Sequence, residues 1–184
     1  MRTLAWIELL ACWAAWWYPY LFRAPHIQKR ESVTVAGPTR LGLLLEVVAI
    51  GLAFLRETGT PRTSPAALLG ALILGVIAAA LAWTSVQHLG KQFRIHAGLY
   101  VDHELVRTGP YAIVRHPIYS SLLAILLVTI LLLTSWTMAI VSLALFVVGT
   151  EIRVRSEDQL LASRFGQQFA EYKRTVPAYL PFVR

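Results

Sequence analysis

The chain has 184 residues, of which 57% are hydrophobic and 15% are charged. Globular domains average about 45–50% apolar and ~25% charged residues, so this composition excludes a disordered chain and argues against an ordinary soluble domain. The net charge is +7, but the basic residues lie between apolar blocks. That placement favours contact with anionic lipid headgroups, so we expect membrane lipids and no nucleic acid among the partners.

Three apolar blocks in the N-terminal half are predicted to be membrane-spanning helices. The first carries four tryptophans and is followed by no small-residue cleavage site, so we expect a retained helix and not a signal peptide. The three blocks are residues 4–22, 41–55 and 66–86, joined by a basic loop over 23–40 and a turn over 56–65.

A fourth apolar region, residues 121–150, is too long for one span of about 20 residues. The polar sequence at 134–137 interrupts it near the middle, which predicts a hairpin of two short helices. The charged tail is predicted to be helical over about 150–174, with Gly166 marking a kink or a close contact. The expected fold class is an all-α integral membrane protein with about five transmembrane helices, the last two a helical hairpin, and a C-terminal helix.

The basic residues predict the orientation of the chain in the membrane. All of them except Arg2, Arg56 and Arg62 fall in the loop over 23–40, in the polar segment over 87–119, or in the tail. Because basic loops stay on the cytoplasmic side, we expect the N-terminus outside and the C-terminal helix in the cytoplasm. The polar segment and the tail then share one side and can build one site.

Several kinds of site are excluded by what the chain lacks. The single cysteine, Cys12, permits no intrachain disulfide and no cysteine-based metal site. The histidines show no ligand spacing with carboxylates, so we expect no metal. The glycines do not form G-x-G-x-x-G, which excludes a soluble Rossmann-type cofactor site.

The polar segment contains a His-Pro dipeptide at a predicted helix start. Pro117 biases His116 away from helix and can open the helix that follows, whose N-terminus favours anions. His116 is therefore a candidate ligand-binding residue, and Tyr111, which follows a Gly-Pro turn, is another. The alternative is a plain helix start beside Arg115 with an interfacial tyrosine.

Charged side chains in the tail and in one span are further candidates. Arg153 and Glu157 share a helix face at i, i+4, so Arg153 can hold an anionic group and Glu157 a hydroxyl or an amine. The alternative is a surface ion pair worth a few tenths of a kcal/mol. Glu46 lies inside an apolar block, where acids are costly and functional by default, although snorkelling to the nearby span end is the alternative.

Together these motifs resemble the isoprenylcysteine carboxyl methyltransferase family and its phospholipid methyltransferase relatives. The shared pattern is His-x-Leu-Val, Gly-x-Tyr and Arg-His-Pro-x-Tyr, then a helical hairpin, Arg-x-x-x-Glu-Asp and Phe-Gly-x-x-x-x-x-Tyr. It stands here at 103–106, 109–111, 115–119, 153–158 and 165–172, and the likeness covers roughly residues 88–182. The resemblance implies one membrane methyltransferase domain over 1–184, with three N-terminal spans in 1–86 and a cofactor-binding catalytic core in 87–184.

The resemblance implies an integral membrane enzyme that uses S-adenosylmethionine and takes a lipophilic small molecule or lipid that enters from the bilayer. This chain departs from the family pattern in having Ser121 where a glycine is usual, Asp158 for a second glutamate, and His96 for a glutamine. By position, the family's cofactor contacts would fall on His103, Glu104, Leu105, Val106, Tyr111, His116, Pro117, Ile118, Tyr119 and Glu157.

The methyl acceptor stays open between the carboxylate of an isoprenylcysteine-like compound and another lipid-like carboxyl, amine or thiol. A carboxylate needs no base, and by position in the family Arg153 would orient it. An amine or thiol must lose a proton, and then Glu46, Glu104 or His116 is a candidate base. Arg153 and Glu46 are therefore the candidate catalytic residues.

Two other functions remain as alternatives. One is a membrane NADPH-dependent reductase of the sterol type, and the other is a non-catalytic lipid-binding membrane protein. The short chain with minimal loops favours a prokaryotic member of the family in the cell membrane.

Overall fold

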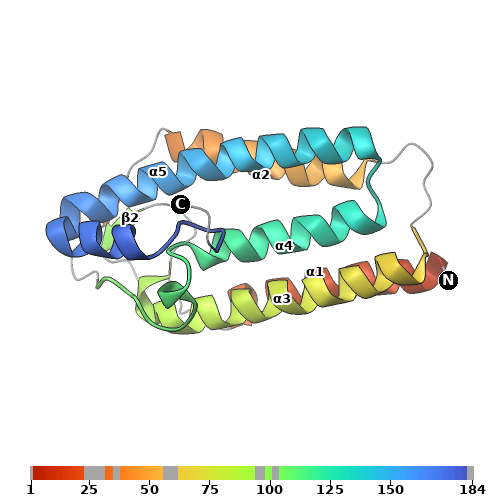
Figure 1. Ribbon diagram of the computed structural model, residues 1–184, viewed down its shortest axis with the longest axis horizontal. Coiled ribbons are helices and arrows are strands. Elements are labelled where there is room, and N and C mark those ends of the chain that lie inside the picture. The colour runs from red at the N-terminus through yellow and green to blue at the C-terminus, as the bar shows by residue number, and fades with distance from the viewer. Residues whose placement is uncertain are drawn as a thin grey trace.

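The computed structural model describes residues 2–22, 32–34, 38–55, 62–93, 98–100 and 104–181, with the backbone alone in the two short strands. Long helices form at all the predicted apolar blocks (Figure 1). The elements in chain order are α1 (Arg2–Phe22), β1 (Ser32–Thr34), α2 (Pro38–Phe54), α3 (Pro65–Leu89), the 3-10 helix η1 (Gly90–Gln92), β2 (Gly98–Tyr100), the 3-10 helix η2 (Gly109–Ala112), α4 (Pro117–Leu132) and α5 (Trp136–Thr175).

A short antiparallel strand pair departs from the expected all-α fold. Ser32 of β1 pairs with Tyr100 of β2, and Thr34 pairs with Gly98. The all-α prediction missed this pair because three-residue strands are too short to show an alternating pattern. The pairing ties the segment after α1 to the polar segment that precedes η2.

Two helices of the described chain are long and apolar enough to cross a membrane. They are α3, counted to residue 92, and the first part of α5, counted to residue 165. α4 is a shorter apolar helix. The count of five spans remains a prediction.

The predicted turn at 134–137 is confirmed, because α4 ends at Leu132 and α5 begins at Trp136. The second helix is not short, however: α5 runs on to Thr175 and includes the predicted tail helix. Ser135 caps α5 by accepting a hydrogen bond from the Met138 amide at 3.4 Å. Thr134 Oγ1 donates to the Ala53 carbonyl at 2.6 Å, which fastens the turn to the end of α2.

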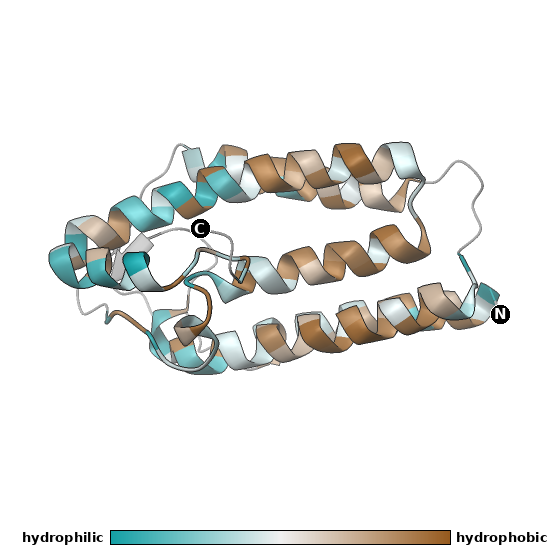
Figure 2. Cartoon of the chain, viewed as in Figure 1, coloured by the Kyte–Doolittle hydropathy of each residue, from teal (hydrophilic) through white to brown (hydrophobic). Residues whose placement is uncertain are grey.

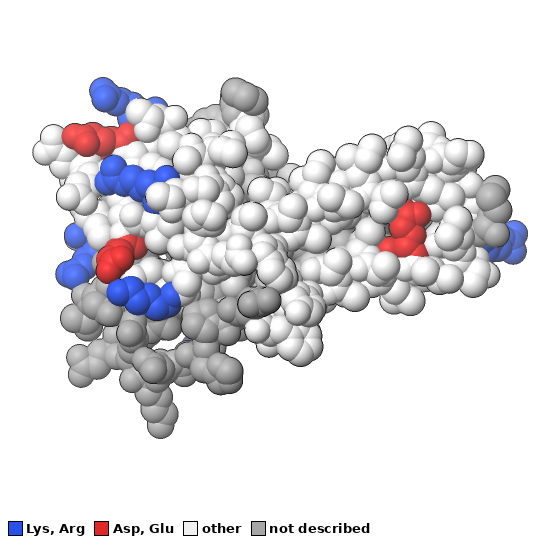
Figure 3. Space-filling model, turned by 90° about the horizontal axis from the view of Figure 1, so that it is seen from below, with Lys and Arg blue, Asp and Glu red and all other residues white. Residues whose placement is uncertain are grey.

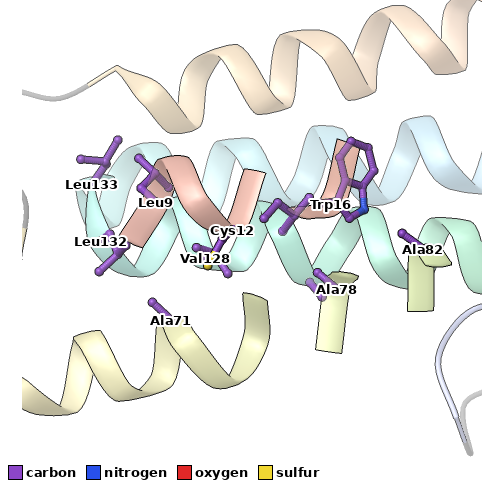
Figure 4. Close-up of a cluster of buried hydrophobic side chains, with 11 residues drawn as sticks. Leu9, Cys12, Trp16, Ala71, Ala78, Ala82, Val128, Leu132 and Leu133 are labelled. Carbon is purple, nitrogen blue, oxygen red and sulfur yellow. The ribbon is translucent and has the colours of Figure 1, made fainter. Parts of the chain in front are cut away.

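α1, α3 and α4 pack around a shared apolar core (Figure 4). α3 contributes small side chains that let α1 approach closely, since a Cβ placed on Gly75 would lie 2.2 Å from Cys12 Sγ. The core contains Leu9, Cys12 and Trp16 of α1, Ala71, Ala78 and Ala82 of α3, and Ala124, Ile125, Val128 and Leu132 of α4, with Leu133.

Two tryptophans of α1 also hydrogen-bond across this core. Trp13 Nε1 donates to Thr129 Oγ1 at 3.0 Å, and Trp16 Nε1 donates to Ser121 Oγ at 3.1 Å. Hydrogen bonds between membrane helices contribute about 0.6–2 kcal/mol each. They fix the rotation of α1 against α4.

α2 packs along the first half of α5 (Figure 1). A Cβ placed on Gly42 would lie 2.7 Å from the Gly149 carbonyl and 2.6 Å from Arg153 Cγ. Only glycine allows this approach. It brings the polar face of α2 against the charged part of α5.

The polar residues gather at one end of the helices. Figure 2 shows the brown apolar stretches along the helices and the teal polar stretches around the C-terminal half of α5 and the end of α3. Figure 3 shows lysine, arginine and acidic side chains concentrated at the same end, with few along the remaining length. The polar end of the helices is therefore the place for a candidate functional site.

The tail folds back onto this end. α5 kinks at Gly166, where φ is 49°, as the sequence predicted. Beyond α5, the Arg115 amide donates to the Pro177 carbonyl at 2.9 Å and the His116 amide donates to the Ala178 carbonyl at 2.8 Å. The polar segment and the tail thus lie together.

Candidate functional site

His116 stands at the backbone break that its proline predicts. It is the N-cap of α4 with φ −127° and ψ 63°, and Pro117 opens the helix. Its amide is held by Ala178 of the tail, and its carbonyl accepts from the Tyr119 amide at 3.0 Å. The imidazole is thereby buried at the junction of α4, α5 and the tail.

The His116 ring lies between two consecutive carboxylates of α5. Nδ1 lies 3.3 Å from Glu157 Oε2, and Nε2 lies 2.9 Å from Asp158 Oδ1. Burial alone lowers the pKa of His116, but hydrogen bonds and charge from Asp158 and Glu157 outweigh it and raise the pKa above its ordinary value. Because both ring nitrogens are engaged, a ligand would meet this residue through the ring face or the backbone.

Asp158 joins the polar segment to the tail. Besides His116, its carboxylate contacts Arg115 at 2.9 Å and Lys173 at 3.0 Å. The Arg115 side chain is itself buried and also donates to the Val176 carbonyl. The sequence indicated Arg115 as a basic residue of the polar segment and as the start of the Arg-His-Pro-x-Tyr pattern, whereas the structure shows it as the buried partner of Asp158.

Glu157 is held from the other side by Tyr119, whose hydroxyl donates to Glu157 Oε1. The guanidinium of Arg153 lies over the Tyr119 ring, 5.1 Å from its centroid. Four residues predicted from the sequence, namely His116, Tyr119, Arg153 and Glu157, therefore form one connected cluster.

Arg153 and Glu46 form a buried ion pair between α5 and α2. Arg153 Nη1 donates to Glu46 Oε2 at 2.8 Å, and Thr150 Oγ1 donates to Glu46 Oε1 at 3.0 Å. Glu46 is 1% exposed, so the snorkelling alternative is wrong. The i, i+4 surface pair of Arg153 with Glu157 is replaced by this contact across 107 residues of sequence.

Tyr111 connects this cluster to the end of α3. Burial raises the pKa of Tyr111 above its ordinary value, and the charges of Tyr20, Glu157 and Tyr172 raise it further. Its carbonyl accepts from the Tyr172 hydroxyl. Its own buried hydroxyl faces Ser85 of α3.

The other residues predicted to contact the cofactor differ in how far they are buried. The Glu104 side chain is 71% exposed and pairs with Lys91 at 3.2 Å, so the structure keeps its carboxylate outside the buried cluster. His103 and His96 lie outside the described residues. Leu105, Val106 and Ile118 are half-buried, and Pro117 is buried beside His116.

Sequence reasoning missed two buried polar residues, Ser85 of α3 and Gln92 of η1. Both amide atoms of Gln92 have no hydrogen-bond partner among the described residues. A signal existed for Ser85, because Ala78, Ala82 and Ser85 follow a spacing of four and three that places them on one helix face. The described residues contain no group of three metal-ligating side chains.

Comparison with known proteins finds one family and several relatives. The model of the isoprenylcysteine carboxyl methyltransferase (ICMT) family matches residues 71–163. The cobalt-zinc-cadmium resistance protein CzcN of Cupriavidus metallidurans is 37% identical over 93 residues, which are 48% of this chain and 42% of that protein.

Two relatives are named for an enzyme activity. The protein-S-isoprenylcysteine O-methyltransferase B of Arabidopsis thaliana is 33% identical over 114 residues, which are 61% of this chain and 56% of that protein. The protein-S-isoprenylcysteine O-methyltransferase of Schizosaccharomyces pombe is 35% identical over 83 residues, which are 45% of this chain and 35% of that protein. The matches thus span about half the length of these relatives or less.

Proposed function

This chain belongs to the isoprenylcysteine carboxyl methyltransferase family, and from that premise we propose that it transfers a methyl group from S-adenosylmethionine to a lipophilic acceptor in the membrane. The observation that carries the proposal is the connection of His116, Tyr119, Glu157 and Arg153 in one cluster. These residues belong to the motifs that the family shares. The names of two relatives support the same reaction class.

The described residues fit S-adenosylmethionine as a ligand. Buried polar atoms without a partner are costly, about 1–3 kcal/mol each, and both amide atoms of Gln92 at the polar end lack a partner among the described residues. The ribose hydroxyls and the base offer donors and acceptors for such atoms. Tyr111, Glu157 and the half-buried Leu105 and Val106 are the residues that would hold the cofactor.

The chemistry divides between cofactor and protein. When bound, S-adenosylmethionine supplies a sulfonium methyl group that is already activated for transfer. The protein must then align the acceptor and exclude water. The buried side chains of His116 and Tyr119 limit the access of water to the cluster.

Arg153 is the residue that we assign to the acceptor. Its guanidinium is fixed by Glu46 at 2.8 Å and by the ring of Tyr119, which removes most of its side-chain freedom. A planar, permanently charged guanidinium suits a carboxylate, because it can make two parallel hydrogen bonds. Glu46 acts as a positioning residue in this scheme.

The structure favours a carboxylate acceptor over an amine or thiol. An amine or thiol needs a base. Each of the three candidate bases either already contacts other side chains or lies outside the cluster. Glu46 accepts from Arg153 and Thr150, both ring nitrogens of His116 contact carboxylates, and Glu104 is exposed. A carboxylate is already ionised at neutral pH and needs no base.

We further propose that five helices cross the membrane, with the N-terminus outside and the polar end in the cytoplasm of a prokaryotic cell. The support is the concentration of described basic residues at one end (Figure 3). The acceptor then reaches Arg153 laterally from the bilayer, since the cluster lies where the apolar helices meet the polar end.

Titration of the purified protein with two ligands separates this proposal from the reductase alternative. We expect saturable binding of S-adenosylhomocysteine and no binding of NADPH in isothermal calorimetry. Binding of NADPH alone would support the reductase instead.

A further inference from the structure

The side chain of Gln92 is buried at the polar end without a partner. Both of its amide atoms lack a hydrogen-bond partner among the described residues, and the residue is 4% exposed. Native proteins leave few such atoms unsatisfied, so a buried unpaired amide indicates a bound polar partner. The hydroxyls of Ser85 and Tyr111 at the same end face each other and can share a hydrogen bond.

Ser85 and Tyr111 meet where η2 packs on the end of α3. η2 docks tightly on the end of α3, since a Cβ on Gly109 would lie 2.3 Å from His88 Nε2. Ser85 lies on the buried face of α3, and the Tyr111 hydroxyl faces it closely enough for the two side chains to interact.

Gln92 is connected to the site through the residue that follows it. Gln92 ends η1, and the ring of Phe93 packs 5.9 Å from the ring of Tyr20. The Tyr20 hydroxyl lies 3.4 Å from Ser121 Oγ in the second turn of α4, the helix that His116 caps. Gln92 therefore lies near the N-terminal end of α4, where His116 and Tyr119 belong to the cluster.

The hydrogen-bonding groups of the Gln92 amide indicate which part of a ligand it would bind. A glutamine side chain offers an acceptor oxygen and a donor NH₂ side by side. A carboxylate would satisfy only the donor, and an ammonium only the acceptor. The edge of an adenine offers a ring nitrogen acceptor next to the donor 6-amino group, and it pairs with glutamine through two hydrogen bonds.

We propose that Gln92 recognises the adenine base of S-adenosylmethionine, which makes it a specificity-determining residue of the site. This inference rests on the proposed function. The hydroxyls of Ser85 and Tyr111, which both donate and accept, serve the remaining polar atoms of the ligand.

The test compares two ligands with three proteins. S-adenosylhomocysteine and its analogue with hydrogen in place of the 6-amino group are titrated calorimetrically into the wild type, Gln92→Leu and Gln167→Leu. Gln167 lies exposed on α5 and contacts Glu171 at 3.5 Å, so it is the matched control. Thermal unfolding without ligand is measured on each protein.

We expect the wild type and Gln167→Leu to bind S-adenosylhomocysteine about tenfold more tightly than the analogue, the value of one lost hydrogen bond that leaves a buried group unpaired. Gln92→Leu should bind the parent ligand at least about tenfold more weakly and should not distinguish the two ligands. Its unfolding midpoint without ligand should be unchanged or raised, because an unpaired amide is replaced by an apolar group of similar shape.

Two results would overturn the inference while leaving the proposed function intact. One is a wild type that binds both ligands equally, which needs no variant and so does not depend on the folding of Gln92→Leu. The other is a Gln92→Leu protein that keeps the wild-type affinity and discrimination, as an amide satisfied by water alone would allow. A wild type that binds no S-adenosylhomocysteine would overturn both proposals.

Discussion

Arg153 of α5 and Glu46 of α2 form an ion pair at 2.8 Å, in which the glutamate is 1% exposed. The residues beside each of them in the sequence give no indication of this contact. The pair fixes the one guanidinium that we assign to the methyl acceptor, and the glycine contact between α2 and α5 makes room for it.

Removing the carboxylate of Glu46 should leave a buried cation without its partner. We predict that Glu46→Gln lowers the free energy of unfolding by about 3 kcal/mol, because a broken buried pair costs far more than a surface pair. The unfolding midpoint in detergent measures this. Arg155→Gln, which removes the exposed pair with Glu151, is the control and should change stability by less than about 0.5 kcal/mol. Equal losses in both variants would contradict the account.

The close approach of α2 and α5 gives a second prediction. Gly42→Ala places a methyl group 2.6 Å from Arg153 Cγ and 2.7 Å from the Gly149 carbonyl, so the helices must separate. We expect a loss of about 1–3 kcal/mol of stability and a loss of methyl transfer. Gly51→Ala on the same helix meets nothing within 4 Å and should be neutral or stabilising by up to about 1 kcal/mol. A Gly42→Ala protein as active as Gly51→Ala would show that the approach has no role.

The raised pKa of His116 predicts how stability depends on pH. The protonated ring is held by Glu157 and Asp158, so the folded state keeps its proton to higher pH than the unfolded chain. The resulting stabilisation is fully present below the unfolded value of about 6.5 and is lost as pH rises through the raised folded value. Unfolding midpoints should therefore fall across this window in the wild type, and His116→Gln should reduce the fall. A midpoint that rises over the same window in the wild type would contradict the assignment.

Asp158 should hold the tail against the polar segment. Asp158→Asn removes the charge that three cationic side chains share, and we expect about 3–5 kcal/mol of destabilisation. Limited proteolysis should then cut the tail beyond Gly166 more rapidly. Lys173→Met removes only the half-exposed partner and should cost about 0.5 kcal/mol or less. If the tail of Asp158→Asn resists proteolysis as well as the wild-type tail does, Asp158 does not hold the tail against the polar segment.

Local signals in the sequence predicted the local parts of this structure. Pro117 marked the backbone break at His116, the polar residues at 134–137 marked the hairpin, and Gly166 marked the kink. Each depends on a few consecutive residues, so pattern and propensity suffice.

The partners of the site residues were not predictable in this way. Arg153 was expected opposite Glu157 because they lie one turn apart, yet its contact is Glu46, which only the packing of α2 brings near. Asp158 was singled out only as a departure from a family pattern, and its role at the junction depends on Arg115 and Lys173. Gln92 showed no motif, and its burial is seen only in the folded chain.

The most direct test of the central claim is methyl transfer itself. Purified protein is incubated with S-adenosylmethionine labelled in the methyl group and with a membrane lipid extract, and label is counted in the organic phase. We expect label in a base-labile ester with the wild type and loss of that label with Arg153→Gln. A folded wild type that binds S-adenosylhomocysteine but labels no extract would contradict the central claim and favour a non-catalytic lipid-binding protein.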